Sequence, residues 1–294
     1  MATPLSADKL LKALRDEGLH VVEHRSWRTH NRNHKGSWGP VHGVMIHHTV
    51  TSGTQSSVDL CYNGHSSLPG PLCHGVIAKD GSVHLVGHGR ANHAGLGDDD
   101  VLRAVIDETA LPADNEANTD GNRSFYGFEC INLGDGKDPW PAAQLEAIEK
   151  AAAAICRAHG WNQRSVIGHK EWQPGKIDPR GFTMDSMRSR VKTRLGGKPD
   201  GPSKPPAPKP PAKYEPFPGA AYFRVGRRSA VITAMGKRLV AEGCGKYEVG
   251  PGPDWSEADR KSYAAWQRKL GYSGSGADGI PGKASWDKLK VPNV

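Results

Sequence analysis

The sequence predicts two domains: a larger domain of class α/β or α+β with a mainly central sheet, followed by a small all-α module. A chain of 294 residues is long enough for one or two domains. Short β-favouring runs alternate with helical patterns over its first two thirds, as in a sheet packed against helices. Residues 198–213 then contain seven prolines in sixteen positions, which is typical of a semi-rigid spacer. We therefore expect domains at residues 1–196 and 214–294, joined by a linker at residues 197–213.

Three longer helices are expected in the first domain, and a short one near residues 58–62 inside an otherwise polar loop at 51–73. Residues 6–17 begin with a serine that can cap the helix, and Gly18 ends it. Residues 141–159 have a proline in the first turn and apolar side chains at helical spacing, and Gly160 ends them. Residues 185–195 show the same spacing and close the domain.

Four stretches of the first domain are expected to be strands. Residues 44–47 form an apolar run, and residues 75–86 read as a hairpin about an Asp-Gly turn. Residues 127–133 form another short apolar run, which contains one acid, and residues 166–167 are a brief strand.

The second domain is predicted to be helical. Residues 231–242 and 256–270 have helical spacing, and a shorter helix is expected to run through Trp286. In a module this small, Trp255, Trp266 and Trp286 are expected to form the core rather than a ligand platform.

The net charge of +8 is unevenly distributed along the chain. Residues 1–195 carry 22 basic and 22 acidic side chains, residues 196–213 carry four and one, and residues 214–294 carry 13 and 8. The basic tail predicts a polyanionic partner, for which nucleic acid and an anionic cell wall are both candidates.

The cysteines, the apolar runs and the N-terminus indicate whether disulfides, a membrane helix or an export signal are expected. Five cysteines without CxxC spacing favour buried or free thiols, although a bridge between Cys61 and Cys73 stays open. No apolar run approaches the roughly 20 residues of a membrane helix. The N-terminus lacks the pattern of a signal peptide, so we expect no export signal.

A loop after the last predicted strand carries most of the candidate chemistry. His169, Lys176 and Asp178 fall within ten residues of a stretch that Pro174, Gly175 and Pro179 interrupt, so it is predicted to be a loop. The loop can therefore fold back and bring His169 and Asp178 to one point. His47, at the end of an upstream strand, can supply a further ligand. Two imidazoles and a carboxylate suit Zn²⁺ with one position left open for water, which is typical of a hydrolase.

Other polar residues near these strands have both a structural and a functional interpretation. Glu129 lies inside an apolar run, where burial would raise its pKa toward the range of a general base. Lys176 can stabilise an oxyanion, or it can be a solvated loop lysine. His93 is either a substrate contact or part of loop packing. His48 follows His47 on the strand and points to the opposite face, so we expect it to be structural.

These residues resemble a known family over roughly residues 20–195. The Ile-His-His-Thr run at 46–49, the Gly-Phe-Glu run at 127–129 and the Gly-His-Lys run at 168–170 followed by Lys-Ile-Asp-Pro at 176–179 resemble zinc-dependent N-acetylmuramoyl-L-alanine amidases. This group is related to peptidoglycan recognition proteins and phage lysozyme-amidases. The resemblance implies a central mixed sheet flanked by helices.

The resemblance also implies roles for individual residues. His47, His169 and Asp178 match the zinc ligands, the last of which is Cys or Asp across the family. Glu129 matches the proposed general base of bacterial members and Lys176 the catalytic lysine of phage members. A tyrosine that many members have before the hairpin strand is missing here, which leaves His74 or His93 as stand-ins that would polarise the substrate.

The combined expectation is a peptidoglycan hydrolase that cleaves the amide between N-acetylmuramic acid and L-alanine. Residues 214–294 are similar to peptidoglycan-binding modules and would hold bacterial peptidoglycan, or anionic wall polymers. The pattern resembles a phage endolysin that stays in the host cytoplasm until it is released to the wall, with a secreted autolysin as the alternative. A non-catalytic peptidoglycan receptor is a rival, and a nucleic-acid-binding protein is disfavoured by the neutral front domain.

Overall fold

The computed structural model describes residues 2–202 and 214–294. The chain divides into two compact units, Met1–Pro205 and Pro206–Val294, and each is described by itself. The predicted linker at 197–213 lies mostly outside the described residues, which exclude 203–213.

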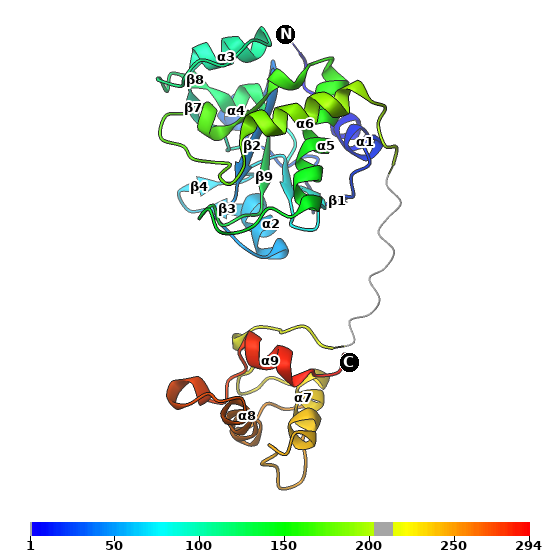
Figure 1. Ribbon diagram of the computed structural model, residues 1–294, viewed down its shortest axis with the longest axis vertical. Helices are drawn as coiled ribbons and strands as arrows, with labels where there is room; N and C mark the ends of the chain where they lie inside the picture. The colour runs from blue at the N-terminus through cyan, green and yellow to red at the C-terminus, as the bar shows by residue number, and fades with distance from the viewer. Residues whose placement is uncertain (1, 203–213) are drawn as a thin grey trace. The chain divides into compact units, whose positions relative to one another are not determined.

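The first unit is built on a mixed sheet (Figure 1). Within residues 2–202, six strands form this sheet in the order β1-β6-β5-β9-β2-β10, and every neighbouring pair is parallel except β5 with β6. The mixed sheet that the family resemblance implied is therefore confirmed. The strands are β1 (Val21–Glu23), β2 (Gly43–His48), β5 (Gly75–Ile77), β6 (Val83–Leu85), β9 (Phe125–Cys130) and β10 (Val166–Gly168). Two short antiparallel pairs lie outside it: β3 (Gly64–His65) with β4 (Leu68–Pro69), and β7 (Leu96–Gly97) with β8 (Thr119–Asp120).

Six helices and three short 3-10 turns accompany the sheet within residues 2–202. They are α1 (Ala7–Asp16), α2 (Thr54–Asn63), α3 (Asp99–Ile106), α4 (Gly121–Ser124), α5 (Ala142–His159) and α6 (Met184–Gly196), with 3-10 turns η1 (Asn33–Lys35), η2 (Gln163–Ser165) and η3 (His169–Glu171). The three longer predicted helices are confirmed as α1, α5 and α6, and the short one expected near residues 58–62 lies within α2. The sequence interpretation missed α3, because its three leading aspartates look like a polar loop. One of them, Asp98, caps the helix by accepting from the amides of Asp100 and Val101.

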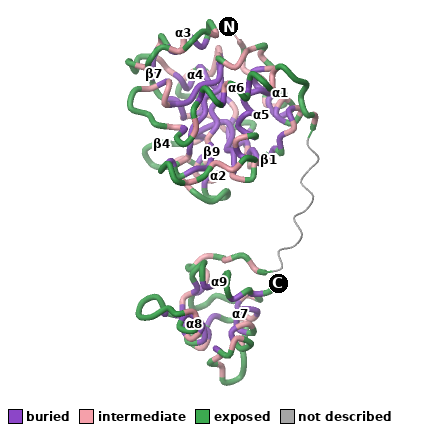
Figure 2. Tube along the Cα trace, viewed as in Figure 1, coloured by how far each residue is buried: buried purple, intermediate pink, exposed green. Residues whose placement is uncertain are grey.

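The central strands are buried on both faces, which explains their apolar sequences. Side chains alternate between the two faces along each strand. Val44, Ile46 and Phe128 belong to one core cluster with residues of α1, α5 and α6. Met45, Phe125 and Ile167, on the opposite face, pack with Val101 and Val105 of α3 and with Trp172. Figure 2 shows the buried sheet and the exposed outer loops. Because His47 and Glu129 follow Met45 and Phe125 at even spacing, they lie on the α3 face of the sheet, beyond its apolar part.

The second unit is a helical module with its own core. Its helices are α7 (Ala230–Ala241), α8 (Glu257–Lys269) and α9 (Lys283–Leu289), with 3-10 turns η4 (Ala220–Tyr222) and η5 (Gly274–Ala277). Ser256 and Asp259 form a capping box at the start of α8. Trp255, Trp266 and Trp286 are all buried in one cluster, as predicted from the sequence.

Two expectations about cysteines and membranes can now be compared with the structure. All five cysteines are buried free thiols, so Cys61 and Cys73 are not bridged. Within the described residues, every helix is too short or too polar to cross a bilayer.

Candidate metal centre

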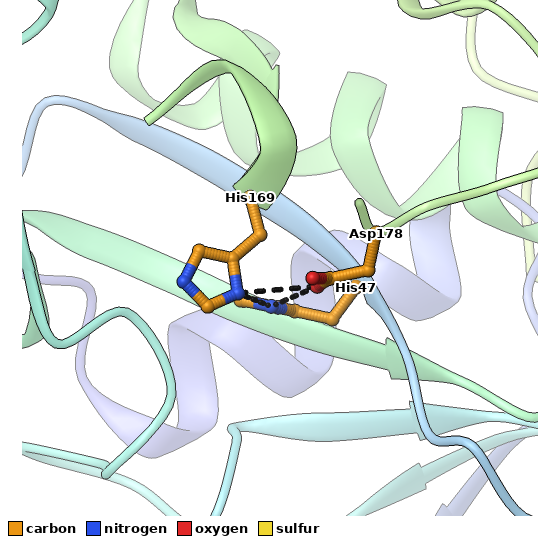
Figure 3. A group of neighbouring side chains, drawn as sticks. All are labelled: His47, His169 and Asp178. Carbon is orange, nitrogen blue, oxygen red and sulfur yellow. Dashed lines mark hydrogen bonds and ion pairs between the residues drawn. The ribbon is translucent and has the colours of Figure 1, made fainter. Parts of the chain in front are cut away.

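Three side chains from separate segments converge at the end of the sheet (Figure 3). His47 Nδ1 lies 3.0 Å from His169 Nδ1 and 3.0 Å from Asp178 Oδ2, and His169 Nδ1 lies 3.1 Å from the same carboxylate oxygen. One ligand atom from each residue falls within 4.8 Å of the others, as in a group that can hold a metal ion. The three side chains therefore lie together, as predicted from the sequence.

The strand register explains why the two histidines meet. β10 and β2 are parallel neighbours, and Gly168 is paired with Ile46. His169 directly follows Gly168, and His47 directly follows Ile46. The two imidazoles therefore leave the same edge of the sheet side by side. The loop after His169 then folds back, and the Lys170 amide donates to the Asp178 carbonyl at 2.7 Å. This closure brings the carboxylate of Asp178 to the histidines.

The ionisation of this group suits a cation. Burial lowers the pKa of His47 to about 4 against the raising effect of Asp178, so its imidazole is neutral at pH 7. Burial acts to raise the pKa of Asp178, but the close contacts with the imidazoles of His169 and His47 outweigh it and hold that pKa well below its usual range. A carboxylate and neutral imidazole nitrogen are the protein ligands that Zn²⁺ accepts. The residues present therefore fit a zinc ion.

Glu129 lies directly beside the cluster on the neighbouring strand. Its register partner across the β2–β9 ladder is His47. The Oε2 atom of Glu129 is buried and has no hydrogen-bond partner among the described residues. Burial, followed by the charge of Asp178, raises the pKa of Glu129 to about 8, and the ammonium of Lys176 opposes this shift. Glu129 is thus a carboxyl group close to its titration point at neutral pH.

Lys176 is an exposed residue of the returning loop, two positions before Asp178. Its positive charge lowers the pKa values of both His47 and Glu129. The charge of Lys176 therefore acts on the cluster, although its side chain is open to solvent.

The two other predicted site histidines are buried behind the cluster. His74 is fully buried, Gly127 N–H donates to its Nδ1 at 2.9 Å, and its Nε2 is 2.9 Å from the Gly89 carbonyl. Both ring nitrogens of His74 are thus occupied by backbone groups, and its predicted contact with the substrate stays a prediction. His93 is 8% exposed and lies 3.1 Å from His47 Nε2 through its own Nδ1. It contacts a predicted metal ligand rather than open space.

Residues 37–181 match the sequence model of the family described as N-acetylmuramoyl-L-alanine amidase. The first unit is an amidase domain of this family. No curated protein sequence matches the chain.

Several solved structures are similar to the amidase domain at low identity. An endolysin N-acetylmuramoyl-L-alanine amidase from Clostridium intestinale is 15% identical with a TM-score of 0.39, and the match covers 58% of this chain and 94% of that one. A mutant endolysin from Bacillus subtilis is 16% identical with a TM-score of 0.42, covering 59% and 99%. The amidase AmiD from E. coli is 14% identical with a TM-score of 0.39, covering 88% and 90%.

His48 has a structural place in the amidase domain, as predicted. It is buried, and its Nδ1 accepts from the Arg180 amide at 3.2 Å. Adjacent strand residues point to opposite faces, so His48 leaves the metal cluster to His47.

Two residues of the amidase domain, Gln173 and Asn122, contact the cluster or its neighbour His93 and were not predicted from the sequence. Gln173 Oε1 lies 3.2 Å from His169 Nε2, and Asn122 Oδ1 accepts from the amides of His93 and Ala94 at 2.8 Å each. Gln173 stands four residues after His169, a spacing that could have suggested a contact. Asn122 has no such local signal, because it is 29 residues from His93.

Proposed function

We propose that this amidase domain cleaves the amide bond between N-acetylmuramic acid and L-alanine of peptidoglycan with the help of a zinc ion. The observation that carries the proposal is the convergence of His47, His169 and Asp178 beside the unpartnered carboxyl of Glu129. The match of residues 37–181 to the amidase family supplies the substrate class and the bond.

Zinc would be held by His47, His169 and Asp178. When bound, it would polarise a carbonyl oxygen and make a water molecule more acidic. Three protein ligands leave a further position open, which is the feature that separates catalytic zinc sites from structural ones.

Glu129 would move the protons. Without a metal ion, burial raises the pKa of Glu129 to about 8 and keeps it mostly protonated at pH 7, and a zinc ion beside it would lower that pKa toward the range of a general base. Its Oε2, which has no partner among the described residues, can accept a proton from the attacking water and return it to the leaving amine. Lys176 would place its ammonium near the oxygen on which negative charge develops, and so stabilise the tetrahedral state.

The second unit would keep the enzyme on its insoluble substrate. Residues 214–294 carry 13 basic and 8 acidic side chains, so they are attracted to anionic wall polymers as well as to peptidoglycan. A tethered wall-binding module raises the local concentration of the amidase domain without adding chemistry. Binding of the isolated polymers by residues 214–294, measured by sedimentation at several salt concentrations, tests this part.

The origin of the chain as a phage endolysin stays a prediction from the sequence. Fractionation of the expressing cells tests it, since unaided export of the full chain would favour the secreted autolysin instead.

The main test combines zinc content with amine release from purified cell walls, for the wild type and His169→Ala. We expect about one zinc per chain and new L-alanine amino termini from the wild type, and loss of both in the variant. If the wild type sediments with walls but holds no zinc and releases no amines, the protein is a receptor and the catalytic proposal fails.

A further inference from the structure

His47 is linked to the backbone of β9 through the buried imidazole of His93. His47 Nε2 lies 3.1 Å from His93 Nδ1, and His93 Nε2 lies 3.3 Å from the carbonyl oxygen of Phe125. The rings of His47 and His93 are nearly perpendicular, at 87°, with their centroids 5.2 Å apart. The contact engages the nitrogen of His47 that points away from Asp178 and His169.

The Phe125 carbonyl oxygen, at the end of this chain of contacts, determines the direction of both hydrogen bonds. A carbonyl oxygen can only accept, so in the contact between His93 Nε2 and the Phe125 oxygen the proton is on His93 Nε2. A neutral imidazole carries one N–H, which leaves His93 Nδ1 as an acceptor. The bond between the two rings therefore requires the proton on His47 Nε2. His47 Nδ1 then carries a lone pair and donates to neither Asp178 Oδ2 nor His169 Nδ1, each 3.0 Å away, so these acceptor atoms face one another where a cation would be held.

We propose that His93 is a positioning residue that fixes the tautomer and orientation of His47, so that His47 Nδ1 presents its lone pair to the zinc ion. This inference rests on the zinc site proposed above. It replaces the substrate contact that the sequence suggested for His93. Histidine ligands in metal sites commonly donate their other ring N–H to a partner that sets their tautomer, and here that partner is a second histidine.

The surroundings of His93 are built to hold its ring in place. Asn122 Oδ1 accepts from the amides of His93 and Ala94, which anchors the backbone at this point. Residue 127, next to the His93 ring, is a glycine. A Cβ at this position would come within 2.5 Å of His93 Nδ1. The glycine of the Gly-Phe-Glu run therefore makes room for His93.

His169 has a comparable but less enclosed partner. Its Nε2 lies 3.2 Å from Gln173 Oε1, an arrangement that leaves His169 Nδ1 free as well. Gln173 is partly exposed on the loop, whereas His93 is buried between the sheet and its own segment. The two histidines thus present the same nitrogen, one held by a rigid buried ring and the other by a flexible side chain.

Nitrogen-15 NMR of histidine-labelled, metal-free full-length protein tests the proton positions directly. We expect His47 and His93 each to be in the Nε2–H form, and His47 to lose this preference in His93→Phe, which keeps an aromatic ring but no acceptor. A wild-type spectrum with His47 protonated on Nδ1 would overturn the proposal, whether or not any variant folds.

Zinc affinity, measured by competition with a chromophoric chelator, is the second readout. We expect roughly 10- to 100-fold weaker binding for His93→Phe, and a smaller loss for His93→Asn, whose side-chain oxygen can still accept from His47. The matched control is His88→Phe, because His88 also bonds a backbone carbonyl, that of Leu5 at 2.9 Å, but does not contact the cluster.

Zinc binding by the wild type and by His93→Phe distinguishes failure of the zinc site from failure of the role given to His93. If the wild type binds no zinc, the proposed function fails first. If the wild type binds zinc and His93→Phe binds it equally well, or if His88→Phe loses as much affinity as His93→Phe, His93 does not position His47.

Discussion

His47 and Glu129 are register partners on neighbouring parallel strands, and their side chains leave the same face of the sheet. The pairing places a carboxyl group beside the imidazole of a proposed metal ligand without any loop between them. Sites built on strands are held more precisely than sites built on loops, because the hydrogen-bonded ladder fixes the backbone. The proposed proton-transfer group and the first proposed metal ligand are therefore positioned by the same two strands.

Replacing Glu129 by glutamine should separate catalysis from metal binding. Glu129→Gln keeps the shape of the side chain but cannot carry a proton between water and the leaving amine, so we expect amine release to fall roughly 10²- to 10⁴-fold. Zinc content should stay near the wild-type value, because Glu129 is not a ligand. Kinetics on purified walls together with metal analysis checks both. Glu116→Gln, an exposed carboxylate of the same domain, is the control, and activity above a tenth of wild type in Glu129→Gln would contradict the role.

The raised pKa of Glu129 also predicts how stability depends on pH in the zinc-free protein. Its folded pKa is about 8 and its ordinary value is 4.5, so between these values the folded state binds more protons than the unfolded state. The free energy of unfolding should therefore fall as pH rises through this window, by at most about 1.4 kcal/mol per pH unit from this group. Glu129→Gln removes the effect.

Urea unfolding of chelator-treated wild type and Glu129→Gln at pH 5 and pH 9 measures this difference. The variant should gain stability relative to the wild type at pH 9. Other titrating groups occur in both proteins and largely cancel in the comparison. An equal difference at both pH values would mean that Glu129 is not held protonated by its surroundings.

The local parts of this site were predictable from the sequence, and the long-range parts were not. The spacing of His169 and Asp178, with a Pro-Gly pair between them and Pro179 directly after, already indicates a loop that folds back. The apolar runs around His47 and Glu129 indicate strands, but periodicity does not say that β2 lies between β9 and β10. The family resemblance implied a mixed sheet and the three ligands, and the strand order that brings the distant segments together came only from the structure. The inward direction of His93 has no local signal, because its partner Phe125 is 32 residues away.

Metal removal should lower both activity and stability of the full chain. A ligand at 100 times its Kd stabilises the folded state by about 2.7 kcal/mol, so chelation should lower the unfolding temperature of the first unit and abolish amine release. Added zinc should restore both. His47→Asn should show no response to zinc, whereas His48→Asn should respond like the wild type, because His48 lies on the opposite face. A matching loss in both variants would show that the response does not come from this cluster.

A single methyl group at position 127 should disturb the metal site without touching a ligand. In Gly127→Ala the new Cβ would meet His93 Nδ1 at 2.5 Å, a distance at which the ring or the strand has to move. If the ring moves, the hydrogen bond to His47 lengthens and zinc binding weakens. We expect a loss of about 1 to 3 kcal/mol in the free energy of unfolding, as for overpacking of a buried position, together with lower zinc affinity. Gly196→Ala, where an added Cβ meets no atom within 4 Å, controls for the substitution itself and should change neither quantity by much. Normal zinc affinity in a destabilised Gly127→Ala would mean that the strand, and not His93, absorbs the extra volume.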